Sequence, residues 1–138
     1  MHGQVTFVTL PAADLATATH FYESVFGWIA DRRPAPAVFF KLPALTIALL
    51  DRAAFDRITG GNPDRRSPPN ALCSWNVASV AEVNEMISRA QAAGATIRRP
   101  PATLEWGGWA GILESPDGHL WEIVWNPRHT IPPAENNL

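Results

Sequence analysis

The sequence predicts an α+β fold made of two similar modules, each with the element order βαβββ. Two stretches of the chain repeat the order apolar strand, capping residue, helix and glycine. Their spacing is also similar, because 13 residues separate Asp14 from Gly27 and 15 separate Ser79 from Gly94. Strand-like segments follow the helix in both stretches, so we expect each module to form a sheet with one helix.

The first module is expected to span residues 4–50. Asp14 is predicted to cap its helix, and Gly27 is predicted to end it. The apolar stripe of this helix consists of Leu15, Ala18, Phe21, Tyr22 and Val25. The expected strands are residues 5–10, 38–42 and 45–50.

The second module is expected to span residues 71–126. Ser79 and Glu82 have the spacing of a capping box, and Gly94 is predicted to end the helix. The apolar stripe consists of Val80, Val83, Met86, Ile87 and Ala90. The expected strands are residues 72–77, 96–98, 109–114 and 119–125. Residues 115–118, Ser-Pro-Asp-Gly, are predicted to form the turn between the last two strands.

Residues 51–70 and 127–138 are expected to lie outside the modules. The first of these segments is rich in glycine, proline, aspartate and arginine, which is typical of a linker loop. Such a loop either closes over a ligand as a lid or connects the modules passively, and the sequence leaves both possibilities open. The C-terminal segment is expected to be a loosely held tail.

Composition and charge exclude several classes of function. A chain of 138 residues suffices for one domain in which two modules share a core. The formal net charge is −2, so nucleic acid is not an expected partner. No apolar run approaches the roughly 20 residues of a membrane helix, and no signal pattern is visible, so a cytoplasmic location without membrane contact is expected. Cys73 is the single cysteine, which excludes an intrachain disulfide and a cysteine-based metal site.

Two motifs resemble those of a known family. The first is FVTLPAADL at residues 7–15, followed by Phe21-Tyr22 and Phe26-Gly27, and the second is SPDGHLWE at residues 115–122. Together they resemble the glyoxalase, bleomycin resistance protein and extradiol dioxygenase superfamily, or vicinal oxygen chelate proteins. The resemblance implies a single glyoxalase-like domain, whose two modules pair into curved mixed sheets around a cleft, and it implies a homodimer. It leaves the chemistry open, because the superfamily includes metal-dependent enzymes and metal-free binding proteins.

The resemblance also implies where a metal site would lie. Metal-dependent members carry a ligand seven residues before the cap of each helix, and here these positions are Phe7 and Leu72. The carboxylate expected on the last strand is present as Glu122, whereas residues 45–50 offer no second carboxylate. A divalent ion needs three or more nitrogen, oxygen or sulfur ligands, so we expect no metal and no cofactor. The alternative is a divalent metal held through Glu122.

Glu122 is the candidate for acid–base chemistry. On a strand with apolar neighbours its carboxylate would be partly buried, which suits a general base or acid. Equally, it could be an inherited ligand position that now only accepts a hydrogen bond. Aligning Asp14 with Ser79 places Thr9 and Ser74 at matching positions of the two first strands, so both are expected to turn toward the cleft.

Exposed aromatic rings are the other candidates for ligand contact. Trp106 and Trp109 flank two glycines, an arrangement that suits stacking on a planar ligand, although the rings could also fill the core or a dimer interface. The predicted ligand-binding residues are Phe7, Thr9, Phe39, Leu72, Ser74, Asn76, Trp106 and Trp109.

The sequence-based hypothesis is a metal-free protein that binds a small organic ligand in an aromatic-lined cleft near Glu122. The alternatives are a lyase, isomerase or dioxygenase that uses Glu122 as a metal ligand or general base, and a subunit that binds another protein. Whether the protein is an enzyme stays open at this point.

Overall fold

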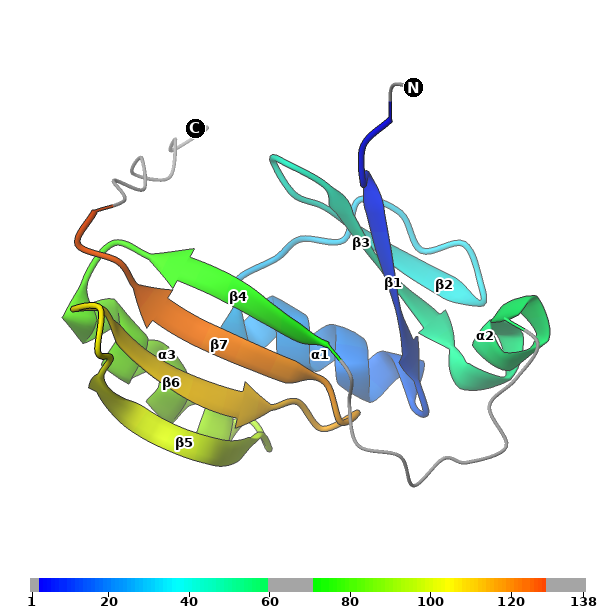
Figure 1. Cartoon of the computed structure of the whole chain (residues 1–138). Coiled ribbons are helices and arrows are strands. Elements are labelled where there is room, and N and C mark those ends of the chain that lie inside the picture. Colours follow the sequence, from blue (N-terminus) through cyan, green and yellow to red (C-terminus); the bar gives the residue numbers. More distant parts are fainter. Residues whose placement is uncertain (1–2, 60–70, 129–138) are drawn as a thin grey trace, which may run out of the picture. The chain divides into compact units, whose positions relative to one another are not determined.

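The computed structural model of the chain describes residues 3–59 and 71–128 (Figure 1). The chain divides into two compact units between Pro68 and Pro69. The elements of the first module are β1 (Phe7–Ala12), α1 (Leu15–Val25), β2 (Ala37–Lys41), β3 (Thr46–Asp51) and α2 (Arg52–Thr59). The elements of the second are β4 (Leu72–Val77), α3 (Val80–Ala92), β5 (Thr96–Thr103), β6 (Trp109–Glu114) and β7 (Leu120–Trp125).

The sheet of the first module has the strand order β1-β3-β2. Strand β1 pairs with β3 in parallel, and β2 pairs with β3 in antiparallel orientation. Where the repeat βαβββ requires one more strand, between α1 and β2, the structure has only an isolated bridge between Arg32 and Phe39. The first module therefore has a mixed, three-stranded sheet, one strand fewer than the repeat predicts.

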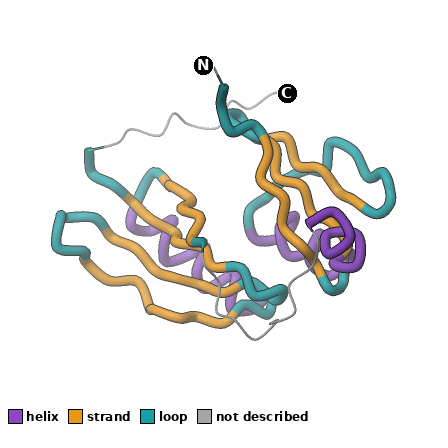
Figure 2. Tube along the Cα trace, turned by 45° about the vertical axis from the view of Figure 1, so that its right-hand side comes forward, coloured by secondary structure: helices purple, strands orange, loops and turns teal. Residues whose placement is uncertain are grey.

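The sheet of the second module has the strand order β4-β7-β6-β5 and completes the predicted βαβββ unit. Strands β4 and β7 are parallel, and the other pairs are antiparallel. Helix α3 lies along one face of this sheet (Figures 1 and 2). The core between helix and sheet contains Val83, Ile87, Leu113, Trp121 and Ile123, which are all buried.

The predicted helix ends are confirmed. Asp14 caps α1 and accepts a hydrogen bond from the Thr17 amide at 2.9 Å. Ser79 caps α3 and accepts from the Glu82 amide at 3.1 Å, while the Glu82 carboxylate accepts from the amide of Ala78 at 2.7 Å. Gly27 and Gly94 follow the two helices with φ of 72° and 100°, a conformation that favours glycine.

An aromatic cluster forms the core of the first module. Tyr22 stacks on Trp28 with ring centroids 5.1 Å apart, and Phe40 packs 5.4 Å from Trp28. Phe40 therefore faces α1. Because side chains alternate along a strand, Phe39 lies on the opposite face of the sheet.

Two elements differ from the sequence-based expectation. The segment predicted as a linker begins with helix α2, whose first turn is capped by the Asp51 carboxylate, which accepts from the Ala53 amide at 3.0 Å. Residues 60–70, on which the lid or linker expectation also falls, and the tail from 129 lie outside the described residues. Strand β5 continues beyond its expected end at residue 98, through Pro100 and Pro101 to Thr103. The prolines are tolerated because β5 is an edge strand, where a residue without an amide hydrogen need not break the sheet pairing.

In the part of the chain that the structure describes, none of the helices has the length and apolar character needed to cross a bilayer.

Candidate functional site

The sheet of the second module has one face covered by α3 and one face turned away from it. Gly111 marks the covered face, because a Cβ built there would lie 3.0 Å from Cδ1 of Ile87 on α3. Strand alternation then assigns the residues of the other face. On strands β4, β7 and β6, this open face of the second module consists of Leu72, Ser74 and Asn76 of β4, Leu120, Glu122 and Val124 of β7, and Ala110, Ile112 and Glu114 of β6.

Glu122 lies near the middle of the open face. Its Cα pairs with Ser74 on one side and with Ile112 on the other. The carboxylate is half-buried, and its Oε1 accepts a hydrogen bond from Ser74 Oγ at 2.9 Å. The predicted register of β4 is therefore confirmed: Ser74, and with it Leu72 and Asn76, shares a face with Glu122, while Cys73 lies on the face toward α3.

Trp106 lies beside the same face, where its ring packs against the backbone of Gly108. A Cβ at Gly108 would lie 2.6 and 2.7 Å from Cζ3 and Cζ2 of the Trp106 ring, and closer still to Cη2. Gly108 alternates with Trp109, so the Trp106 ring lies over the backbone on the side opposite to α3. The residue is 44% exposed. The side chain thus offers a flat apolar surface at the start of β6.

Trp109 does not share this face. Its Nε1 donates to Asn84 Oδ1 of α3 at 2.9 Å, which fixes the indole on the helix side of the sheet. The prediction that Trp109 lines the same surface as Glu122 is therefore wrong. Sequence proximity to Trp106 suggested a shared role, but the alternation of side chains along β6 separates the two rings.

The first module has its own open face, turned away from α1. Phe7 and Phe39 meet there edge to face, with ring centroids 6.1 Å apart and an interplanar angle of 85°. Phe7 is 53% exposed, and the Arg32 guanidinium lies over the Phe39 ring at 5.0 Å. Thr9, which pairs with Ala48, is exposed on the same face. Around Phe7 and Phe39 this surface is aromatic, and the Arg32 cation lies above the Phe39 ring.

The donor atoms of each module do not fit a divalent ion. At the family's ligand positions, Phe7 and Leu72 have no ligating atom. Around Glu122, the nearby side chains of its face offer a hydroxyl, an amide and the carboxylate of Glu114, which is already paired with Arg98. Within residues 3–59 and 71–128, no group of three His, Cys, Asp or Glu side chains could hold a metal ion. Neutral hydroxyls and amides are weak replacements for the charged or imidazole ligands such a site requires.

Cys73 is not poised for nucleophilic chemistry. It is half-buried on the α3 side of β4 and pairs with Trp121. Burial raises the pKa of its thiol above the usual value, which disfavours the reactive thiolate.

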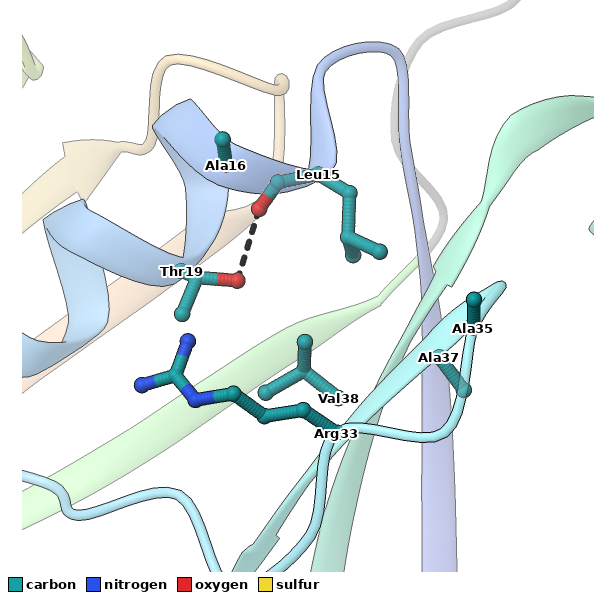
Figure 3. Close-up of a pocket in the computed structure, with 7 residues that line it drawn as sticks. All are labelled: Leu15, Ala16, Thr19, Arg33, Ala35, Ala37 and Val38. Carbon is teal, nitrogen blue, oxygen red and sulfur yellow. Dashed lines mark hydrogen bonds between the residues drawn. The ribbon is translucent and has the colours of Figure 1, made fainter.

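An open recess of about 330 Å³ lies elsewhere in the first module (Figure 3). It is lined by Leu15, Ala16 and Thr19 of α1 and by Arg33, Ala35, Ala37 and Val38. Its polar groups are already engaged, because Thr19 Oγ1 donates to the Leu15 carbonyl at 2.6 Å and Arg33 pairs with Glu23 at 2.5 Å. None of the predicted site residues lines this recess, so it is not the candidate site.

Two arginines on the open faces are absent from the sequence-based candidates. Arg99 of β5 pairs with Ile112 and so lies on the face of Glu122, and Arg32 lies over Phe39 in the first module. A signal for them exists in the sequence, because the tripeptide Arg-Arg-Pro occurs once in each module, at 32–34 and 98–100.

Comparison with known proteins identifies the family. A family model described as the Glyoxalase/Bleomycin resistance protein/Dioxygenase superfamily matches residues 4–123. The chain belongs to this superfamily, as the motifs predicted. A solved structure of a glyoxalase-related enzyme from Fulvimarina pelagi is similar at 31% identity and a TM-score of 0.83, covering 90% of this chain and 88% of that one.

Other solved structures share the fold at lower identity. A glyoxalase/bleomycin resistance protein/dioxygenase family enzyme from Burkholderia phytofirmans PsJN is 19% identical with a TM-score of 0.82, over 89% of this chain and 98% of that one. A lactoylglutathione lyase from Agrobacterium tumefaciens is 24% identical with a TM-score of 0.68, over 91% and 95%. None of the curated proteins matches the chain.

Proposed function

We propose that this superfamily member binds a small organic ligand, without a metal ion, on the open face of the second module beside Glu122. The observation that carries the proposal is the surroundings of Glu122. Its Oε1 accepts from the neutral Ser74 hydroxyl, and the other carboxylate of its face, Glu114, is paired with Arg98. Among the described residues no group of three His, Cys, Asp or Glu side chains could hold a metal ion. A half-buried carboxylate in such surroundings serves to orient a ligand.

The open face combines the two kinds of contact that ligand sites use. Ile112, beside Glu122, and the exposed ring of Trp106 supply apolar surface for a planar or amphipathic molecule. Asn76 and the second carboxylate oxygen of Glu122, Oε2, supply polar contacts. Among the described residues Oε2 has no partner, so it can accept a hydrogen bond from a hydroxyl or amine of the ligand. For the first module, Phe7, Thr9 and Phe39 stay predicted ligand contacts on its own open face.

A metal-free enzyme is the second candidate. The hydrogen bond from Ser74 holds the Glu122 carboxylate in one orientation, as a general base requires. Similarity to the glyoxalase-related enzyme from Fulvimarina pelagi supports this candidate as well. Binding and catalysis would then use the same carboxylate, with a ligand proton transferred to Oε2.

Elemental analysis of untagged protein tests the metal-free part of the proposal. We expect near-zero metal, with no added divalent ion retained after desalting. About one tightly held metal ion per chain would refute it and favour a metalloenzyme centred on Glu122.

Ligand screening by tryptophan fluorescence then tests the site. Binding should weaken in Glu122→Gln and in Trp106→Ala, and it should be unchanged in Trp109→Phe, whose ring lies on the helix side. Equal weakening in all three variants would count against the open face as the site. If Glu122→Gln keeps binding but loses turnover of a compound, the enzyme candidate is favoured.

A further inference from the structure

A row of paired residues crosses the open face of the second module from one edge of the sheet to the other. The row is Ser74, Glu122, Ile112 and Arg99, on strands β4, β7, β6 and β5. Neighbouring strands lie about 4.8 Å apart, so the backbones that carry Glu122 and Arg99 are about 10 Å apart with Ile112 between them. A carboxylate and a guanidinium thus flank an apolar position on one face.

A β-bulge places the arginine there. Ile97 pairs with Leu113 on the helix side and Arg99 pairs with Ile112 on the open face, so Arg98 is an extra residue in β5. In a regular strand, consecutive arginines would point to opposite faces, and one would meet α3. The arginine that would meet α3 is Arg99, and the bulge turns it onto the open face. Arg98 bonds the carboxylate of Glu114, a residue of the open face, with Nε at 2.6 Å from Oε2.

Arg98 and Arg99 therefore differ in what they can bind. The charge of Arg98 is matched by Glu114, whereas the Arg99 guanidinium makes no hydrogen bond or ion pair with the described residues, and Arg99 is exposed. Its guanidinium has donors available in the fixed fork that matches a carboxylate.

The first module repeats this arrangement. Its corresponding row is Thr9, Ala48, Phe39 and Arg32. Both rows begin with a hydroxyl residue and end with an arginine beside an apolar side chain. In both modules the other arginine of the Arg-Arg-Pro tripeptide is held by a glutamate, Arg33 by Glu23 and Arg98 by Glu114. Arg32 also lies 4.0 Å from Asp31, a distant and exposed pairing.

We propose that Arg99 binds the anionic group of the ligand and so defines its chemical class: a small acid with an apolar body and a hydrogen-bond donor at the far end. This inference rests on the proposed function. The acid group would pair with Arg99, the body would lie over Ile112, and the donor would reach Oε2 of Glu122. The reverse orientation would set two carboxylates against each other, so the row selects both the class of ligand and its direction.

A matched series of aromatic probes tests the assignment: 4-hydroxybenzoate, its uncharged amide 4-hydroxybenzamide, and benzoate, which lacks the donor. Binding is measured by titration calorimetry at low salt. We expect 4-hydroxybenzoate to bind more tightly than the other two. Arg99→Met should weaken binding of the acid by about tenfold or more, since a bidentate guanidinium–carboxylate contact is lost, and should leave the amide unchanged. Arg99→Lys should keep part of the preference.

Arg89→Met is the matched control, because it removes the same charge from α3, on the other face of the same sheet, where Arg89 pairs with Glu85 at 2.7 Å. It should leave all three affinities unchanged. Equal affinity of wild-type protein for acid and amide, or an acid preference that survives in Arg99→Met, would overturn the assignment.

The two proposals fail differently. If Glu122→Gln weakens binding of acid and amide alike while Arg99→Met changes neither, the proposed site stands and the anion assignment is wrong. If no probe binds, both are contradicted for this class of ligand.

Discussion

Alanine substitution of Gly108 and of Gly111 in the second module should destabilise the protein in the reverse of the order that steric overlap of the new Cβ alone predicts. At Gly108, a new Cβ would overlap the Trp106 ring at 2.7 Å or less. At Gly111 it would lie 3.0 and 3.2 Å from Cδ1 and Cγ1 of Ile87 and 3.3 Å from the Arg99 carbonyl oxygen. The overlap is more severe at Gly108, yet we expect Gly111→Ala to destabilise the protein more.

The reason is that the groups next to the two glycines differ in their freedom to move. Trp106 is 44% exposed, so its ring can turn into solvent. Burying a large apolar side chain stabilises by about 1.5–3 kcal/mol, so complete loss of the half-buried contact costs at most about 1.5 kcal/mol. Alanine also restricts the unfolded chain, which returns about 0.4–1 kcal/mol because Gly108 has no positive φ. The free energy of unfolding should therefore fall by about 1 kcal/mol or less in Gly108→Ala.

Gly111 has no such freedom. Ile87 is 5% exposed in the core, and the other neighbour is backbone. Overpacking of a filled core costs about 1–3 kcal/mol, of which the same restriction of the unfolded chain returns about 0.4–1 kcal/mol. Urea unfolding of the two variants, followed by circular dichroism with m-values compared to wild type, measures the difference. A larger loss of unfolding free energy in Gly108→Ala than in Gly111→Ala would refute the argument that the exposed ring can move aside whereas the core cannot.

Helix capping and its pH dependence give two further predictions. Ser79→Ala removes the cap of α3 and should lower the free energy of unfolding by about 1 kcal/mol. The control Ser24→Ala, at an exposed position within α1, should change the free energy of unfolding by less than about 0.5 kcal/mol. Equal effects of the two substitutions in urea unfolding would contradict the capping role. The amide of Thr17 lowers the pKa of Asp14 below 3.8, so its contribution is complete above the unfolded pKa and is lost as pH falls through the folded pKa. The difference in unfolding free energy between wild type and Asp14→Asn should therefore shrink from pH 6 to pH 3, and a constant difference would rule out this linkage.

The parts of the fold that depend on local sequence follow from the sequence with few errors. Asp14, Ser79, Gly27 and Gly94 end the helices as expected because a cap needs only a side-chain oxygen or a tolerated positive φ within one turn. The turn at residues 115–118 is local in the same way, with the Gly118 amide donating to the Ser115 carbonyl at 2.8 Å.

Apart from helix α2, the errors lie where pairing with distant residues decides. Prolines argue against a strand at residues 100–101, but β5 is an edge, which only the sheet order reveals. Trp109 resembles Trp106 in sequence, but the hydrogen bond to Asn84 of α3 separates their faces. Arg98 and Arg99 are adjacent and chemically identical, and only the bulge against β6 distinguishes their roles.

The sequence by itself determined the superfamily, the two-module repeat and the positions of α1 and α3, and it made Glu122 a candidate, because motifs, caps and periodicity are properties of neighbouring residues. The tertiary structure decided which residues share a face with Glu122. That assignment depends on strand register, where a shift of one residue moves every side chain to the other side of the sheet. Register placed Ser74 beside Glu122, removed Trp109 from that face and added Arg99 to it.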